Sequence, residues 1–448
     1  MRIRLKHADT IISCDEQDRV YRNTDLWMRD GVIEAIGASE TKADETIDAS
    51  GMLVYPGLVN VHHHLYQYFT RNLAAVQDYA LFDWLKALYD IWKNLHADTV
   101  RLSSALGMAE LMRYGCTTCF DHHYVFPAGA GDLIGAQVQA AEAIGMRLHT
   151  SRGSMDRSVK DGGLPPDSVV QRVDVILKDS ERVIGRYHDP ARYSMRRVVL
   201  APCSPFSVSE DLLRESAMLA REKGVQLHTH LCETKDEERY TIERFGMRPL
   251  AYLERLGWTG SDVFYAHGIH FTDAELDRIA ETGTKIAHCP CSNMKLSSGV
   301  MRIRDMMDRG IGIGLGVDGS ASNDASNLME EIRTAYLLHR LTSGKRAPSG
   351  YALLKMATVG GARVLGRDDI GCLAPGMAAD LFAVRKRGDL VCAEDDPKNL
   401  LGTVGLHRPC DLVFVNGVCT VRDGVLTRID EQATYREAQR EVNRLLNG

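Results

Sequence analysis

The amino-acid sequence predicts an α/β fold, a (β/α)8 TIM-like barrel with a small β-sandwich domain that both ends of the chain form together. Two observations predict the barrel. The middle of the 448-residue chain alternates short apolar strands with helical patterns, which is typical of a parallel sheet. Eight such strands occur, and most of them end on a residue that can bind a metal ion or a proton. Because the carboxyl ends of barrel strands converge on one mouth, this coincidence favours a closed barrel.

The β-sandwich is predicted from hairpin patterns at the two ends of the chain. Apolar and polar residues alternate along Met1–Ile12, and Asp30-Gly31 separates two apolar stretches as a hairpin turn does. Near the other end, Ala379–Val384 is a strand candidate. Asn416-Gly417 and Asp423-Gly424 predict two successive hairpin turns. Two β-rich ends around an α/β middle therefore indicate a small domain assembled from both termini.

The barrel is expected over residues 57–369, and residues 1–56 and 370–448 are expected to form the sandwich. The eight barrel strands are expected at Leu58–His62, Thr117–Asp121, Arg147–Ser151, Val198–Cys203, Val225–His230, Val263–His267, Lys285–Cys289 and Ile313–Asp318. An open doubly wound sheet would leave their polar ends spread along a crevice, whereas polar ends on strands one, five, six and eight favour closure. Residues 160–168 are expected to form a loop over the mouth.

Composition and charge indicate an enzyme rather than a nucleic-acid or membrane protein. The net charge is −6, with no sign of the basic face that a nucleic-acid binder carries. No apolar run is long enough to span a bilayer, and the first residues lack the apolar core of a signal peptide. The 11 cysteines are scattered, which favours reduced thiols and a cytoplasmic location. We expect a homo-oligomer that acts on a small molecule.

The segment PGLVNVHHH, residues 56–64, is the first candidate for metal binding. His62 and His64 are two residues apart, so at a strand end their side chains point to the same face, where they can grip one metal ion. His63 should then point the other way. The alternative is a polar loop that happens to carry three histidines, which is less favoured directly after an apolar strand.

The segment QLHTHLCET, residues 226–234, adds a third imidazole and a carboxylate. His230 lies three residues before Glu233, where a strand passes into a loop. A third nitrogen ligand and a carboxylate that moves protons suit a catalytic metal site. His228 shares the face of His230 and could compete with it as the ligand, but the spacing to Glu233 favours His230.

His267 and Asp318 complete the constellation. His267 ends a strand in FYAHGIH, a place where a lone histidine is more often structural. Asp318 in GVDGSASND could be a metal ligand or a base for the attacking water, although a strand-end aspartate is often only a helix cap. Together, histidines and carboxylates at several strand ends indicate a catalytic site, because structural zinc sites are closed and rich in cysteine.

A second metal interpretation uses the cysteines. Cys116 and Cys119 form a C-x-x-C pattern, and Cys289 and Cys291 form C-x-C. Zinc nucleoside deaminases combine H-x-E with P-C-x-x-C, but here Gly115 precedes Cys116 and the chain has no H-x-E. These thiols are therefore expected to pack as small apolar side chains.

Five motifs stand in an order that resembles the amidohydrolase superfamily, in particular its deaminase and chlorohydrolase branch. They are PGLVNVHHH, HTHLCET, AHGIH, AHCPCSN and GVDGSASND, and with the β-rich ends the resemblance covers essentially the whole chain. It implies one divalent metal ion, zinc first and iron second, held by His62, His64, His230 and Asp318. It also implies that Glu233 is the proton shuttle, and that His267 orients the attacking water and polarises the substrate.

Within that branch, several segments resemble deaminases of oxopurines. They are HHHLYQYFTR, GCTTCFDHHYVFP, RGSMDRSVKDGGLPP and LAPCSPFSVS. The resemblance implies hydrolysis of 8-oxoguanine to urate and ammonia, with isoxanthopterin or a hydroxylated triazine as alternative substrates. One departure is Cys232, where a small residue such as alanine or glycine is expected. A thiol there could make the activity sensitive to oxidation.

Three residues are expected to bind the substrate. Gln67 follows His64 by three residues, and its amide can pair with both a ring N–H and a carbonyl. Arg152 and Cys203 end strands three and four. Arg152 could hold a substrate oxygen or instead pair with a loop carboxylate, and Cys203 could read the substrate or simply pack.

Two other function classes compete with this hypothesis. A metal-free barrel that acts as a scaffold would purify without stoichiometric metal. Relatives that hydrolyse cyclic amides often bind two metal ions bridged by a carboxylated lysine on strand four, but VVLAPCSPF contains no lysine. Hydrolytic deamination by a single metal ion is therefore the favoured hypothesis.

Overall fold

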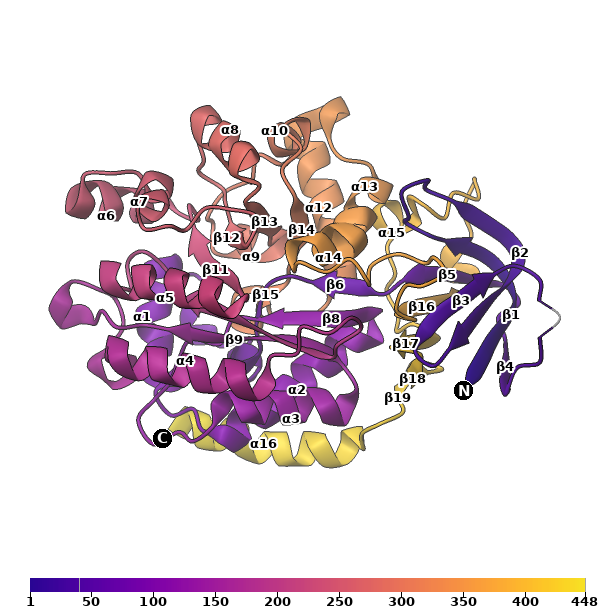
Figure 1. Ribbon diagram of the computed structural model, residues 1–448, viewed down its shortest axis with the longest axis horizontal. Coiled ribbons are helices and arrows are strands. Elements are labelled where there is room, and N and C mark those ends of the chain that lie inside the picture. The colour runs from indigo at the N-terminus through magenta and orange to yellow at the C-terminus, as the bar shows by residue number, and fades with distance from the viewer. Residues whose placement is uncertain (40, 448) are drawn as a thin grey trace.

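The computed structural model describes residues 1–39 and 41–447, and in it the eight predicted barrel strands form one parallel sheet (Figure 1). In sheet order the strands are β6 (Leu58–Asn60), β8 (Cys116–Asp121), β9 (Arg147–Ser154), β10 (Arg196–Pro202), β11 (Gln226–Leu231), β12 (Val263–His267), β13 (Lys285–His288) and β14 (Ile313–Leu315). The first and last strands also meet, because the Val61 amide donates to the Leu315 carbonyl at 3.1 Å. Nearby, β7 (His63–His64) pairs with β15 (Asp318–Gly319). The predicted closed barrel is confirmed.

Apolar residues fill the barrel interior, as they do in packed barrels of this class. Val59, Phe120, Val199 and Phe264 come from four different strands and belong to one fully buried cluster. Residues on both faces of these strands are buried, which is why the strands are near-continuous apolar runs rather than alternating ones. The polar side chains of the candidate site gather toward the carboxyl ends of the strands.

Helices surround the barrel. They are α1 (Leu81–Trp92), α2 (Ala97–Arg113), α3 (Leu133–Ile144), α4 (Val173–Tyr187), α5 (Glu210–Lys223), α6 (Lys235–Phe245), α7 (Pro249–Arg255), α8 (Asp273–Thr282), α9 (Pro290–Lys295), α10 (Ile303–Asp308), α11 (Ser320–Asn323), α12 (Leu328–Ser343), α13 (Gly350–Lys355), α14 (Gly361–Val364), α15 (Leu400–Thr403) and α16 (Glu431–Asn447). Several of these helices begin and end at residues with local capping signals. For example, Thr272 and Glu275 form a capping box at the start of α8, and Gly283 ends that helix with a left-handed φ of 71°.

The two ends of the chain together form a nine-stranded sheet beside the barrel (Figure 1). Its strands are β1 (Arg2–Ile12), β2 (Val20–Arg29), β3 (Val32–Ile36), β4 (Glu45–Asp48), β5 (Met52–Pro56), β16 (Leu381–Arg385), β17 (Leu412–Val415), β18 (Val418–Arg422) and β19 (Val425–Leu426). The predicted hairpins at Asp30-Gly31, Asn416-Gly417 and Asp423-Gly424 are present, and all six residues have positive φ. Two-residue turns of this conformation match the twist of antiparallel strands.

Two further segments pack against helices of the barrel. Helix α16 leaves the terminal sheet and packs along α2 of the barrel (Figure 1). The 160–168 segment forms two short turns, Val159–Asp161 and Asp167–Val169, and is held against α6, where the Tyr240 hydroxyl donates to the Gly162 carbonyl at 3.0 Å. No helix among the described residues is long and apolar enough to cross a membrane.

Candidate active site

Three histidines and one aspartate from different strands meet at the mouth of the barrel. The Nε2 atoms of His64 and His230 lie 3.1 Å apart. The Oδ1 atom of Asp318 lies 3.3 Å from Nε2 of His62 and 3.2 Å from Nε2 of His64. All four side chains are buried. The structure therefore brings together the four residues whose types and positions suggested a metal site.

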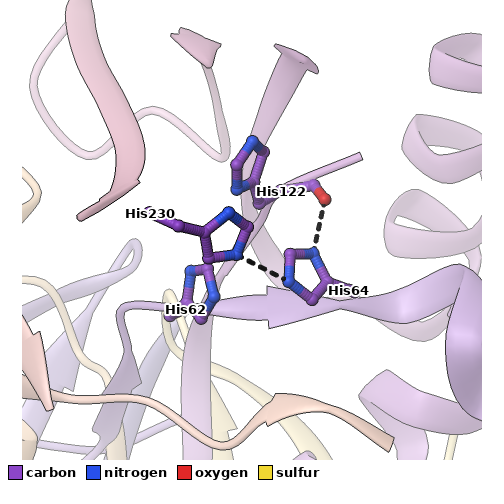
Figure 2. Close-up of side chains that lie close together, drawn as sticks. All are labelled: His62, His64, His122 and His230. Atoms are coloured by element: carbon purple, nitrogen blue, oxygen red, sulfur yellow. Dashed lines mark hydrogen bonds between the residues drawn. The ribbon is translucent and has the colours of Figure 1, made fainter. Parts of the chain in front are cut away.

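The remaining ring nitrogens of two of these histidines face backbone carbonyls. Nδ1 of His64 lies 2.7 Å from the His122 carbonyl, and Nδ1 of His230 lies 2.7 Å from the Cys203 carbonyl; Figure 2 shows the first of these contacts. Because a carbonyl only accepts, each Nδ1 must carry the hydrogen. Each Nε2 then presents a lone pair toward the cluster, as metal-ligating histidines usually do.

The arrangement fits a divalent metal ion. Nε2 of His62 is fully buried, yet it has no hydrogen-bond partner among residues 1–39 and 41–447. Candidate ligand atoms of His62, His230, His267 and Asp318 lie within 4.8 Å of one another. Nitrogen donors with one carboxylate suit zinc or iron in a catalytic site. Burial lowers the pKa of His62 to about 3, so the ring is neutral and able to bind a cation.

His122 is a neighbour of this cluster that the sequence analysis did not single out. It directly follows β8 and groups with His62, His64 and His230, as Figure 2 shows. Its Nε2 lies 2.8 Å from the Ala201 carbonyl. The His122-His123 pair after a buried strand was the available signal, because strand alternation sends one of two successive side chains inward.

Glu233 and His267 face each other beside the cluster. Oε2 of Glu233 lies 3.5 Å from Nε2 of His267, and Oε1 accepts a hydrogen bond from the Ser298 hydroxyl at 3.1 Å. Nδ1 of His267 lies 2.9 Å from Oδ1 of Asn293. Burial raises the pKa of Glu233. Burial alone would lower the pKa of His267, but the carboxylates of Glu233 and Asp318 and the contact with Asn293 together outweigh burial, and the pKa is raised.

The backbone around Glu233 is fixed by a second buried carboxyl group. Glu237 accepts hydrogen bonds from the amides of Cys232 and Glu233 at 2.9 and 3.1 Å. Cys232 itself has a φ of 54°, so the chain turns sharply between β11 and α6. Glu237 thus holds the turn that directs Glu233 inward.

Asp318 has the opposite electrostatic environment to Glu233. Burial would raise the pKa of Asp318, but the neighbouring rings of His62 and His64 hold it well below its usual range. The Ser292 hydroxyl also donates to Oδ2 at 2.5 Å. A carboxyl group with a raised pKa and one with a lowered pKa therefore share a site, the usual arrangement of an acid and a base.

A small cavity of about 30 Å³ opens beside these groups. It is lined by His64, Gln67, Leu81, Trp84, Leu85, Tyr124, Cys203, Phe206, His230, Glu233, His267, Leu296, Asp318 and Ser322. Two of the three residues expected to bind substrate, Gln67 and Cys203, are among them. Burial raises the pKa of Cys203 to about 12, so it lines the cavity as a neutral thiol.

Arg152, the third residue expected to bind substrate, does not belong to this lining. Its Nε donates to Asp179 at 2.6 Å, its Nη2 donates to Gln171 at 2.7 Å, and its guanidinium lies 3.8 Å from the centre of the Phe126 ring. Strand β9 runs on to Ser154, so Arg152 is not its last residue. Alternation turns Arg152 outward to α4, and its acidic partner lies on that helix rather than on a loop.

The cysteines do not build a second metal site within the described residues. None of the residue groups there that could hold a metal ion contains a cysteine. Cys116 and Cys119 are buried in β8, and Sγ of Cys116 donates to the Thr118 carbonyl at 3.1 Å. They pack as part of the apolar core, as expected.

Comparison with known proteins places this geometry in a family. The amidohydrolase family model matches residues 53–424. The chain is 45% identical over 427 residues to the 8-oxoguanine deaminase of Pseudomonas aeruginosa, covering 94% of this chain and 95% of that protein. It is 39% identical over 457 residues to hydroxydechloroatrazine ethylaminohydrolase of Pseudomonas sp. strain ADP, covering 98% and 94%.

A solved structure agrees with these sequence matches. The atrazine chlorohydrolase of Arthrobacter aurescens TC1, complexed with zinc, superposes with a TM-score of 0.95 at 31% identity, covering 98% of this chain and 100% of that chain. The family is metal-dependent, and this chain has a candidate His/Asp metal site in its barrel mouth. The family model spans most of the chain and both relatives match nearly end to end, so this chain belongs to the amidohydrolase family.

Proposed function

We propose that this protein is a hydrolytic deaminase of an amino-substituted oxopurine, converting 8-oxoguanine and water to urate and ammonia. The observation that carries the proposal is that Glu233 and Asp318, whose pKa values are shifted in opposite directions, line one cavity with three imidazoles. The 45% identity to an 8-oxoguanine deaminase over 94% of the chain supports the choice of substrate.

The proposed ligands of a single zinc ion are His62, His64, His230 and Asp318. Their donor set and burial support a cation at this position. When bound, such an ion lowers the pKa of water toward about 7 and so supplies a nucleophile at neutral pH. Zinc is favoured over iron because the atrazine chlorohydrolase of the same fold was solved with zinc.

The two carboxyl groups divide the proton transfers. Asp318, which favours its charged form, takes a proton from the attacking water, and the oxygen adds to the ring carbon that carries the amine. Glu233, whose pKa is raised, protonates the adjacent ring nitrogen, so no charge remains on the ring. Asp318 then passes its proton to the amine, which leaves as ammonia. The hydroxyl on that carbon gives its proton back to Glu233 and becomes the carbonyl of the product. His267 lies close to both carboxyl groups, and its proposed role is to orient the water and polarise the substrate.

The cavity wall provides the binding surface. Leu81, Trp84, Leu85, Phe206 and Leu296 form an apolar part of the lining that suits the face of a planar heterocycle and excludes bulk water. Gln67 offers both an amide donor and an acceptor to the polar edge of such a ring. Cys203 is proposed as a further contact with the substrate.

A second candidate is a hydroxylated amino-triazine. The 39% identity to hydroxydechloroatrazine ethylaminohydrolase and the fold shared with an atrazine chlorohydrolase favour it. The same carboxyl groups would protonate a ring nitrogen and the leaving amine. Isoxanthopterin, a bicyclic ring with an amine beside a ring nitrogen, is a third substrate to compare.

The test is ammonia release from purified protein of known metal content, offered 8-oxoguanine, isoxanthopterin, guanine and a hydroxylated amino-triazine. We expect kcat/KM to be highest for 8-oxoguanine, with urate accumulating. A higher kcat/KM for the triazine would move the substrate assignment to that class. No ammonia from any of the four, with metal bound, would contradict the proposed deamination of these rings.

Two further properties are proposals as well. The 11 cysteines are all free thiols, most of them buried, which supports a reducing compartment such as the cytoplasm. A homo-oligomer is expected from the sequence and stays a prediction, which light scattering during gel filtration would check.

A further inference from the structure

One of the three clustered histidines is oriented differently from the other two. His64 and His230 each place Nδ1 against a backbone carbonyl. His62 instead places Nδ1 3.0 Å from Nε2 of His228. The other nitrogen of His228, Nδ1, lies 3.0 Å from the Phe264 carbonyl. A histidine side chain therefore occupies the place that a backbone carbonyl takes for the other two.

The position of every hydrogen in this chain of contacts follows from the Phe264 carbonyl. That oxygen only accepts, so Nδ1 of His228 carries a hydrogen. A neutral His228 then has a lone pair on Nε2, which must accept from Nδ1 of His62. His62 in turn is left with a lone pair on Nε2, the atom that has no hydrogen-bond partner within the described chain and lies 3.3 Å from Asp318.

We propose that His228 is a positioning residue that fixes His62 in the Nδ1–H tautomer, with its Nε2 lone pair directed at the metal position. This inference rests on the proposed metal-binding function. It also resolves the alternative left open by the sequence, because both nitrogens of His228 are already hydrogen-bonded and neither faces the cluster with a free lone pair.

Packing holds His228 in this role. Its ring is fully buried on β11, with the ring of Phe264 at a centroid distance of 4.3 Å and that of Phe120 at 4.8 Å. The neighbours come from β12 and β8, so rotation of the imidazole would require the barrel interior to repack. A neutral acceptor also avoids placing another buried charge in apolar surroundings, as a carboxylate at this position would.

Two substitutions and a matched control test the proposal through metal affinity. His228→Leu keeps much of the volume but removes the acceptor, while His228→Gln keeps an acceptor oxygen near the position of Nε2. The control is His339→Leu, which removes the partner of another buried histidine pair, His288 and His339, whose Nε2 atoms lie 3.0 Å apart. Zinc affinity is measured for each protein by competition with a chelator.

We expect His228→Leu to weaken zinc binding about 10- to 100-fold, in line with the effect of removing the partner of a ligating histidine. His228→Gln should recover most of that loss, and His339→Leu should bind zinc within about twofold of the wild type. Wild-type affinity in His228→Leu, or an equal loss in His228→Leu and His339→Leu, would overturn the proposal.

A second measurement does not depend on any variant folding or on catalysis. The nitrogen chemical shifts of metal-free wild-type protein labelled in its histidines report which ring nitrogen of His62 carries hydrogen. We expect the Nδ1–H form, and the Nε2–H form would overturn the proposal. If the wild type bound no zinc at all, the proposed function would lose its metal site, whereas this tautomer measurement would still decide the role of His228.

Discussion

Three residues at the mouth of the barrel adopt the left-handed backbone conformation, which is rare for residues other than glycine. Cys232, His267 and Asp318 lie at the ends of three barrel strands or just beyond them, with φ values of 54°, 71° and 63°. Left-handed backbone costs on the order of 1–2 kcal/mol in a residue that carries a Cβ. Each of these turns directs a proposed functional side chain, or the neighbouring Glu233, toward the cavity.

Removing the acidic proton of Glu233 tests its role. Glu233→Gln keeps the shape of the side chain but cannot protonate a ring nitrogen, so we expect kcat to fall about 100- to 10,000-fold. Bound zinc per chain should not change, because Glu233 is outside the proposed ligand set. Ammonia release and metal content are measured on the same sample. Turnover at the wild-type rate would remove Glu233 from the mechanism.

Gly319 provides a test of Gln67. A Cβ at position 319 would overlap the amide of Gln67, although φ at Gly319 is −68° and the backbone accepts alanine. We expect Gly319→Ala to displace Gln67 and lower kcat/KM at least about 10-fold, with zinc content unchanged. Gly185→Ala is the matched control, since a Cβ there meets nothing within 4 Å. Equal activity of both variants would argue against Gln67 as a substrate contact.

A site residue could be predicted from the sequence when strand alternation alone determines which way its side chain points. His62 and His64 could be expected to act together because residues two positions apart in a strand point to the same face. Arg152 could not be placed, because its direction depends on where β9 ends, and the strand runs three residues beyond the predicted Ser151. His122 was passed over because the sequence does not say which of two successive histidines points inward.

At the scale of secondary structure, buried carboxyl groups connect helices to the turns that carry the site. Glu237 of α6 accepts hydrogen bonds from the backbone amides of Cys232 and Glu233, in the turn that follows β11. Glu331 of α12 accepts from the Cys291 amide at 3.1 Å and from the Asn323 side chain at 2.6 Å. These contacts join α12 to α9 and to α11, the short helix that follows Asp318.

Glu331 also predicts how stability depends on pH. Burial raises its pKa to about 8 in the folded protein, against about 4.3 in an unfolded chain. Between these values the folded state holds a proton that the unfolded state has lost, so this group makes the free energy of unfolding fall as pH rises from about 5 to 8. Glu331→Gln, which does not titrate, should show a shallower fall in denaturant unfolding at pH 6 and pH 8. An unchanged slope would contradict the raised pKa.

Hairpin turns and barrel strands could be predicted because their signals are local. Asp-Gly and Asn-Gly pairs favour positive φ at both turn positions, whatever the rest of the chain does. The domain boundaries at 56/57 and 369/370 stay a prediction. Helix α16 illustrates the difficulty, because it follows the terminal sheet in sequence but packs on α2 of the barrel.

At the scale of the whole molecule, the barrel positions the proposed metal ligands, and segments outside the strands form the apolar wall of the cavity. Every proposed metal ligand lies at or just after a barrel strand, which is why the sequence pattern could predict their meeting. The apolar wall comes instead from α1 and from the loop after β10, where Phe82 and Phe206 pack at a ring distance of 4.9 Å. Trp84 and Phe206 could not be predicted as lining residues, because long-range packing alone brings them to the cavity.

Isotope labelling of the product tests the central claim most directly. The zinc-loaded protein is mixed with 8-oxoguanine in water enriched in ¹⁸O, and ammonia and the purine product are quantified together by mass spectrometry. Hydrolytic deamination predicts urate that carries one oxygen atom from the solvent and one ammonia for each urate formed. Recovery of unchanged 8-oxoguanine, or a product without solvent oxygen, would contradict the account.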